Sequence, residues 1–202
     1  MNKVYKVFPG GKFKVLTFSY DDGKIEDRRL VKLFNKFNLK ATFNLNTGII
    51  DPAIRIPQKE WPELYKGHDI AVHTFTHPTM IRLNNYNALR EILDDKDNLE
   101  KIFKRPIYGL AYPNGSYDNR IVDIAKSVGI KYARVTNDKY AATKAAEAYA
   151  ANAEGPILIG DENGFSMPED YMCWVPTCHH NHNLVDFGKK FMALTKKQYL
   201  YM

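Results

Sequence analysis

Two adjacent carboxylates, Asp21 and Asp22, are the first residues of this sequence whose types and spacing could do chemistry. They follow an apolar run at residues 15–18, which predicts a short buried strand, and Gly23 stands directly behind them. In α/β folds, ligands lie beyond the carboxyl ends of strands, which is where this pair would be. Two like charges a few ångströms apart resist joint ionisation, so a metal ion on one carboxylate would leave the other free to act as a base. The alternative is an ordinary Asp-Gly turn that closes a strand.

A pair of histidines, His73 and His77, is the second such feature. Residues 70–73 predict a strand, and Pro78 would end the extended segment. Side chains alternate along an extended segment, so two residues that are four apart face the same side. Two neutral imidazoles and one carboxylate are three protein ligands that leave a position open for water, the pattern of a catalytic zinc site. Histidine pairs at this spacing also occur without a metal, so the pair alone does not decide the function.

Taken together, the two features resemble the motifs of the NodB-like polysaccharide deacetylases. Residues 17–23 read Thr-Phe-x-x-Asp-Asp-Gly, and residues 67–77 read Gly-His-Asp-Ile-x-x-His-Thr-x-Thr-His. The resemblance implies an α/β fold, a distorted and incomplete (β/α) barrel, with Asp21 as the general base. It also implies one bound divalent metal ion, for which zinc is preferred over cobalt, nickel or manganese. The metal ligands that it implies are Asp22, His73 and His77.

The third family motif is usually Arg-x-Pro-x-Gly, whereas residues 111–115 read Ala-Tyr-Pro-Asn-Gly. Ala111 therefore stands where relatives carry an arginine that orients the base carboxylate. The resemblance gives the backbone N–H of Asn114 the role of oxyanion donor, and it places Tyr112 and Pro113 in the substrate site. Without the first two motifs, this segment would be interpreted as a plain turn.

Residues 173–182 combine two cysteines, a tryptophan and three histidines. A second metal site is one interpretation, but the ligand spacing matches no standard zinc pattern. A loop at the barrel mouth fits better, with Trp174 lining an acetyl pocket or stacking on a sugar ring. A polar surface loop with a buried tryptophan is an equally open alternative.

Members of the family usually supply a catalytic acid, a histidine on or just after the last strand. Residues 198–202 look like that strand and carry no histidine. We therefore expect that the sequence stops just short of this acid. If the acid comes from within the chain, the first candidate is His179, followed by His180 and His182.

Strands and helices alternate along the chain and must position these residues. Apolar periodicity predicts helices over residues 27–37, 57–65, 87–103, 118–128 and 183–193. Strands are expected at residues 15–18, 41–46, 70–73, 107–112, 130–135 and 198–202. This alternation indicates a mostly parallel sheet or barrel, in a single domain over residues 1–202. Residues 137–167, of which residues 137–153 are Ala-rich, are expected to be a peripheral excursion.

The composition limits the partners. The 202 residues carry a net charge of +6, but the basic residues are scattered, so we expect no nucleic acid partner. No apolar run approaches the roughly 18 residues that a membrane span requires. No signal peptide is visible at the start, which predicts a cytoplasmic protein or one whose leader has been removed. Nothing in the sequence indicates an obligatory protein partner.

The sequence therefore predicts a metal-dependent hydrolase that removes N- or O-acetyl groups from a carbohydrate. One alternative is a metal-containing carbohydrate-binding pseudo-enzyme, which Ala111 and the missing terminal histidine both favour. Another is a hydrolase that acts on an amide or a phosphate ester, because three-ligand metal sites support many reactions.

Overall fold

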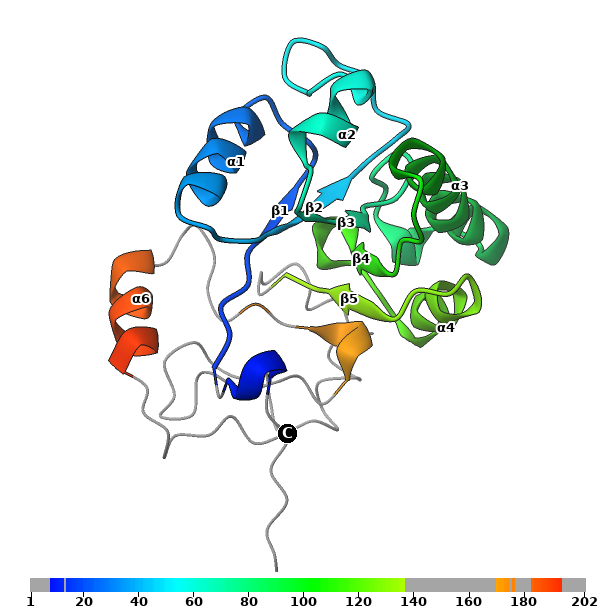
Figure 1. Ribbon diagram of the computed structural model, residues 1–202. Coiled ribbons are helices and arrows are strands. Elements are labelled where there is room, and N and C mark those ends of the chain that lie inside the picture. Colours follow the sequence, from blue (N-terminus) through cyan, green and yellow to red (C-terminus); the bar gives the residue numbers. More distant parts are fainter. Residues whose placement is uncertain (1–7, 13, 137–169, 175, 177–182, 194–202) are drawn as a thin grey trace, which may run out of the picture.

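Five parallel strands, hydrogen-bonded in chain order, form the centre of the molecule (Figure 1). The computed structural model describes residues 8–12, 14–136, 170–174, 176 and 183–193. The strands are β1 (Ser19–Asp21), β2 (Thr42–Leu45), β3 (Asp69–Val72), β4 (Gly109–Ala111) and β5 (Tyr132–Arg134). Right-handed connections between parallel neighbours place the linking helices on one face of a sheet. The sheet curls into a half-barrel with helices outside it, which confirms the predicted incomplete (β/α) barrel.

A helix links each strand to the next. These helices are α1 (Asp27–Lys36), α2 (Trp61–Leu64), α3 (Asn85–Phe103) and α4 (Asn119–Ser127), and α6 (Leu184–Ala193) comes later in the chain. Short 3-10 turns are η1 (Pro9–Gly11), η2 (Gln58–Glu60), η3 (Met80–Arg82), η4 (Pro113–Gly115) and η5 (Tyr171–Cys173). Helices α3 and α4 begin at side-chain caps, since Asn84 accepts from the Asn87 N–H and Asp118 accepts from the Ile121 N–H. None of the described helices is both long and apolar enough to cross a membrane.

The core lies between the strands and these helices. The apolar side chains on β2, β3 and β4 are almost completely buried, and they meet the apolar faces of α3 and α4. Fully buried apolar side chains of these elements include Phe43, Leu45, Ile70, Ile92, Leu99, Leu110 and Ile121. The resulting packing fixes the ends of the strands, and therefore the loops that follow them.

The predicted position of the first strand is wrong. Residues 15–18 lie outside the sheet, and Val15 and Leu16 are 41% and 51% exposed. The first residue that pairs with β2 is Ser19, which lies opposite Thr42. Asp21 is consequently the last residue of β1, so the carboxylate pair still occupies the carboxyl end of a strand.

A later segment continues the sheet beyond β5. The N–H of Trp174 donates to the carbonyl of Ala133 at 2.8 Å, and the N–H of Val135 donates to the carbonyl of Trp174 at 3.0 Å. These bonds form a parallel bridge beside β5. The predicted excursion at residues 137–167 and the predicted strand at residues 198–202 lie outside the described residues.

Candidate active site

Residues at or after the carboxyl ends of β1, β3, β4 and β5 line one cleft of about 610 Å³. Six of the residues singled out in the sequence line it: Asp21, Asp22, His73, His77, Tyr112 and Asn114. The other lining residues are Thr79, Ile81, Arg82, Ser116 and Thr136. Because parallel strands end at the same edge of a sheet, residues far apart in the sequence meet here.

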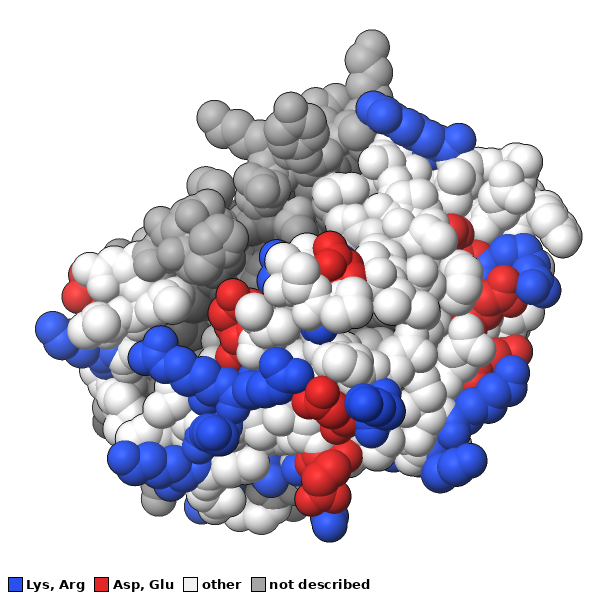
Figure 2. Space-filling view, turned by 90° about the horizontal axis from the view of Figure 1, so that it is seen from above, with Lys and Arg blue, Asp and Glu red and all other residues white. Residues whose placement is uncertain are grey.

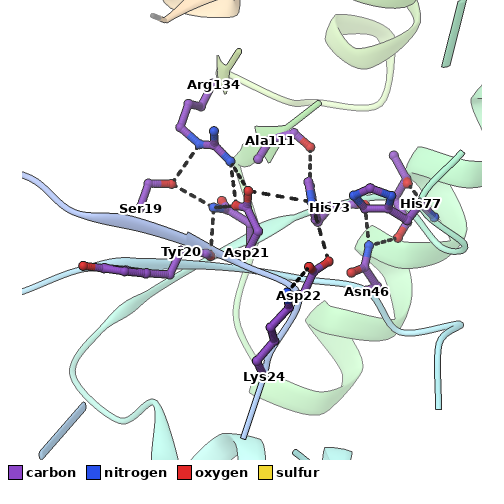
Figure 3. Close-up of polar contacts among 12 residues, drawn as sticks. Ser19, Tyr20, Asp21, Asp22, Lys24, Asn46, His73, His77, Ala111 and Arg134 are labelled. Atoms are coloured by element: carbon purple, nitrogen blue, oxygen red, sulfur yellow. Dashed lines mark hydrogen bonds and ion pairs between the residues drawn. The ribbon is translucent and has the colours of Figure 1, made fainter. Parts of the chain in front are cut away.

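Asp22, His73 and His77 form a group that could hold a metal ion. One ligand atom from each residue lies within 4.8 Å of the ligand atoms of the other two. The nearest oxygen of Asp22, Oδ1, is 4.0 Å from Nε2 of His73. Two imidazoles and one carboxylate suit divalent transition metals. The structure therefore brings together the three ligands that the sequence predicts (Figure 3).

The backbone holds His73 in the tautomer that a ligand needs. Its Nδ1 donates to the carbonyl of Ala111 at 2.7 Å, which leaves the lone pair on Nε2, the atom that faces the carboxylates. Burial lowers the pKa of His73, so the ring is neutral and can donate this lone pair. The donor set and its orientation both fit a divalent metal ion.

A buried carboxylate on α3 supports the same histidine from behind. Oδ2 of Asp95 accepts the N–H of His73 at 3.1 Å, while Oδ1 accepts the N–H and the hydroxyl of Thr47, each at 2.7 Å. Burial raises the pKa of Asp95 to about 7, although these hydrogen bonds act in the opposite direction. Asp95 therefore ties the ends of β2 and β3 together directly beneath the site.

The two histidines meet for a different reason from the one predicted. The strand ends at Val72, and the chain then turns, with φ of 64° at Thr74 and 59° at His77. The imidazole rings of His73 and His77 lie edge to face, with centroids 4.7 Å apart. The side chain of Asn46 holds this turn by donating to the carbonyls of His73 and Thr74 at 2.5 and 2.9 Å. A tight loop, and not strand alternation, brings the pair together.

Asp22 is held by two cationic side chains. Its backbone has a φ of 78°, which is uncommon for a residue other than glycine. The guanidinium of Arg55 donates to the Asp22 carbonyl and, at 3.3 Å, to its Oδ1. The Lys24 ammonium is 3.5 Å from Oδ2. These contacts fix the unusual turn that places an oxygen of Asp21 at 3.9 Å and an oxygen of Asp22 at 4.0 Å from His73 Nε2.

Asp21 is paired with an arginine that the sequence analysis missed. Nη2 of Arg134, at the end of β5, lies 2.6 Å from both carboxylate oxygens (Figure 3). The amide of Asn44 donates to Oδ1 at 2.8 Å. Burial by itself would raise the pKa of Asp21, but these donors stabilise the carboxylate and the pKa is lowered. His73 adds to this effect only when protonated, and its burial keeps it neutral. Asp21 is therefore ionised at neutral pH.

The turn after β4 presents Asn114 to the cleft. Asn114 is exposed and has a φ of 55°, while the N–H groups of Gly115 and Ser116 close the turn by donating to Tyr112 and Pro113. The N–H of Asn114 takes no part in these two bonds. Tyr112 is buried and lines the cleft, whereas Pro113 is buried and is not a lining residue.

The remaining predicted residues do not meet this group within the described part of the chain. Trp174 lies against β5, its ring 6.1 Å from that of Tyr171, and it is not among the residues that line the cleft. A role for Trp174 in substrate binding stays a prediction. His179, His180 and His182 lie outside the described residues.

The charge on the surface is mixed. On the face shown in Figure 2, basic side chains are spread around the described surface and acidic side chains lie between them. The excess of six positive charges therefore does not gather into one continuous patch on this face.

The sequence profile of one family, described as polysaccharide deacetylase, matches residues 9–133. The chain belongs to this family. The matched region runs from before β1 into β5, so it contains both the carboxylate pair and the two histidines. A comparison with curated protein sequences found no match.

Solved structures of deacetylases share the fold. The Streptococcus pyogenes deacetylase PplD, in complex with acetate, is 28% identical, with a TM-score of 0.60 over 64% of this chain and 58% of that one. A polysaccharide deacetylase from Bacillus cereus is 18% identical, with a TM-score of 0.63 over 86% of this chain and 50% of that one. A mutant of BA3943, a CE4 family pseudoenzyme with restored enzymatic activity, is 15% identical, with a TM-score of 0.55 over 88% of this chain and 62% of that one. The chain thus spans between half and two thirds of the length of these proteins.

Proposed function

We propose that this polysaccharide deacetylase family member is a metal-dependent hydrolase that removes acetyl groups from a carbohydrate. The observation that carries the proposal is the placement of an ionised carboxylate beside a three-ligand group. Oδ2 of Asp21 is 3.9 Å from Nε2 of His73, which itself belongs to the group with Asp22 and His77. Family membership supports an acetylated carbohydrate as the substrate.

The metal would be held by Asp22 Oδ1, His73 Nε2 and one ring nitrogen of His77. When bound, a divalent ion supplies Lewis acidity for the acetyl carbonyl and lowers the pKa of a coordinated water. Zinc is the ion that we propose first, because two histidines and a carboxylate are a common ligand set of catalytic zinc sites. Cobalt, nickel and manganese remain the alternatives.

Asp21 would accept the proton of the attacking water. Its Oδ1 already accepts hydrogen bonds from both Arg134 and Asn44, whereas Oδ2 accepts only from Arg134. Oδ2 is also the oxygen that faces His73. We therefore assign the basic lone pair to Oδ2, and a base placed in this way contributes about 10²- to 10⁴-fold in rate.

The backbone N–H of Asn114 would donate to the oxygen of the acetyl carbonyl as negative charge develops on it. A donor in such a position contributes about 10²- to 10³-fold. Tyr112 would form part of the wall against which the acetyl group packs. The departing amine, or alcohol in an O-acetyl ester, then needs a proton, and His179 is our candidate for the acid.

Metal content and acetate release test this assignment together. We expect the purified chain to hold about one divalent ion, measured by mass spectrometry of the metal, and the His73→Ala and His77→Ala variants to lose it. Asp21→Asn should retain the ion but release acetate from acetylated oligosaccharides at least about 10²-fold more slowly. Asp123→Asn, an exposed carboxylate on α4, is the matched control and should behave as wild type. Normal turnover by Asp21→Asn would show that another group is the base.

A second candidate function is carbohydrate binding without catalysis. It is favoured by Ala111, which removes the usual arginine of the third motif, and the family contains at least one pseudoenzyme. Under this alternative, the chain would bind an acetylated oligosaccharide in a calorimetric titration but release no acetate at any metal loading.

A further inference from the structure

We infer that Arg134 is the positioning residue for the base, and that it delivers to Asp21 from strand β5 the guanidinium that Ala111 on strand β4 lacks. This inference rests on the proposed role of Asp21. Three observations support it: the contacts of the guanidinium, the register of the two strands, and the place of β1 and β5 in the sheet.

The guanidinium contacts fix the carboxylate in one orientation. Nη2 of Arg134 bonds both oxygens of Asp21 at 2.6 Å, and Nε donates to the hydroxyl of Ser19 at 3.1 Å. The amide of Asn44 donates to the same hydroxyl and to Oδ1 of Asp21, each at 2.8 Å. Four side chains thus form a closed set of hydrogen bonds, in which rotation of the carboxylate would break at least two. Oδ2 is thereby kept toward His73.

The strand register explains how an arginine on β5 can do this. Arg134 is the direct partner of Ala111 in the parallel β4–β5 pair. Side chains of register partners project to the same face of a sheet, because the pleat gives both strands the same alternation. Ala111 is completely buried, and its methyl group carries no hydrogen-bond donor that could orient the carboxylate. Positions 111 and 134 are therefore two adjacent starting points for a guanidinium that reaches the same carboxylate.

The same contacts connect the first and last of the five paired strands, β1 and β5. Ser19 and Asp21 belong to β1, and Arg134 belongs to β5, so the guanidinium spans the interior of the curled sheet. Because it connects β1 with β5, the ion pair could serve only to hold the half-barrel together, without any role in orienting the base. The test must therefore separate the orientation of Asp21 from the stability of the half-barrel.

The first arm of the test does not depend on activity. In a crystal structure of Arg134→Ala, we expect the Asp21 carboxylate to rotate so that Oδ2 no longer faces His73 Nε2, with the five strands in place. In Arg134→Ala combined with Ala111→Arg, we expect the carboxylate to return to its original orientation. An unchanged Asp21 in Arg134→Ala would overturn the inference.

The second arm is kinetic. We expect Arg134→Ala to lower kcat for acetate release by about 10- to 100-fold, with KM, metal content and thermal midpoint close to wild type. The kcat of Arg134→Lys should lie between those of wild type and Arg134→Ala, because an ammonium does not reproduce the planar fork of a guanidinium. The double variant with Ala111→Arg should regain at least tenfold in kcat. Arg28→Ala, which removes an arginine–carboxylate pair outside the cleft, is the matched control.

The outcomes are distinguishable. A fall in kcat that parallels loss of metal or of folded protein would assign Arg134 a structural role only and overturn the inference. An unchanged kcat in Arg134→Ala would also overturn the inference, but it would leave the proposed function intact. A wild-type chain that releases no acetate would contradict the proposed function, and the crystallographic arm would still decide the positioning of Asp21.

Discussion

The pH dependence of stability should be set in part by Asp27, a buried carboxylate at the start of α1. Only 5% of Asp27 is exposed, and its Oδ2 accepts the hydroxyl of Tyr65 at 2.8 Å. A Cβ on Gly23 would lie 3.7 Å from that hydroxyl, so the pair supports the turn that carries Asp21 and Asp22. Burial raises the pKa of Asp27 from 3.8 to about 6, against the effect of the Tyr65 hydrogen bond.

The sign of the effect follows from this shift. The folded chain holds the proton of Asp27 more tightly than the unfolded chain, so the contribution to stability is complete below about pH 4 and is lost as the pH rises through 6. At about 1.4 kcal/mol for each pH unit, the free energy of unfolding loses about 3 kcal/mol across this window. The amide that replaces the carboxyl in the Asp27→Asn variant cannot ionise, so the free energy of unfolding of this variant does not fall in this way as the pH rises.

Urea unfolding of both proteins between pH 4 and pH 8, in the presence of a chelator, measures the difference. We expect Asp27→Asn to gain about 3 kcal/mol relative to wild type from pH 4 to pH 8. The exposed Asp123→Asn should show a small difference that does not change over this range. A difference between Asp27→Asn and wild type that stays constant with pH would refute the assignment of a raised pKa to Asp27.

Two further variants test the scaffold of the site. A Cβ at Gly109 would come within 3.0 Å of the Tyr132 ring, so Gly109→Ala should lower the free energy of unfolding by about 1–3 kcal/mol in urea, and a loss below about 0.5 kcal/mol would contradict this packing. Asn46→Ala removes both donors to the turn at His73 and Thr74, and should weaken zinc binding by about 10- to 100-fold in a calorimetric titration. An unchanged affinity would show that the turn holds without Asn46.

Much of the fold could be predicted because the local signals agree with the tertiary structure. The helix expected at residues 87–103 is observed at Asn85–Phe103, since its apolar spacing is regular over five turns. The helix expected at residues 118–128 is observed at Asn119–Ser127, between the Asp118 cap and Gly129 with a φ of 86°. The position of β1 was missed because Val15 and Leu16 are apolar but largely exposed, and of residues 15–18 only Phe18 packs against the core. Apolar composition alone does not determine which residues a sheet will pair.

In the candidate site, too, local sequence features could be predicted and contacts that depend on strand pairing could not. The carboxylates and histidines could be found because their motif lies in short stretches of sequence. Arg134 could not, because its contact with Asp21 spans 113 residues and depends on the register of β4 and β5. The alanine at position 111 was the available signal, and it would have directed attention to an arginine at the end of the neighbouring predicted strand. Asp95 carried no signal, since it is one of several acidic residues in a long helix.

The most direct test of the proposed function is a metal titration of the chelator-treated chain, with acetate release from an acetylated oligosaccharide as the readout. We expect no release from the metal-free chain, a rise in rate as zinc is added, and a plateau at one ion per chain. His77→Ala should show no such plateau at the same concentrations. Full activity in the metal-free chain, or no acetate at any loading with any of the four metals, would contradict a metal-dependent deacetylase.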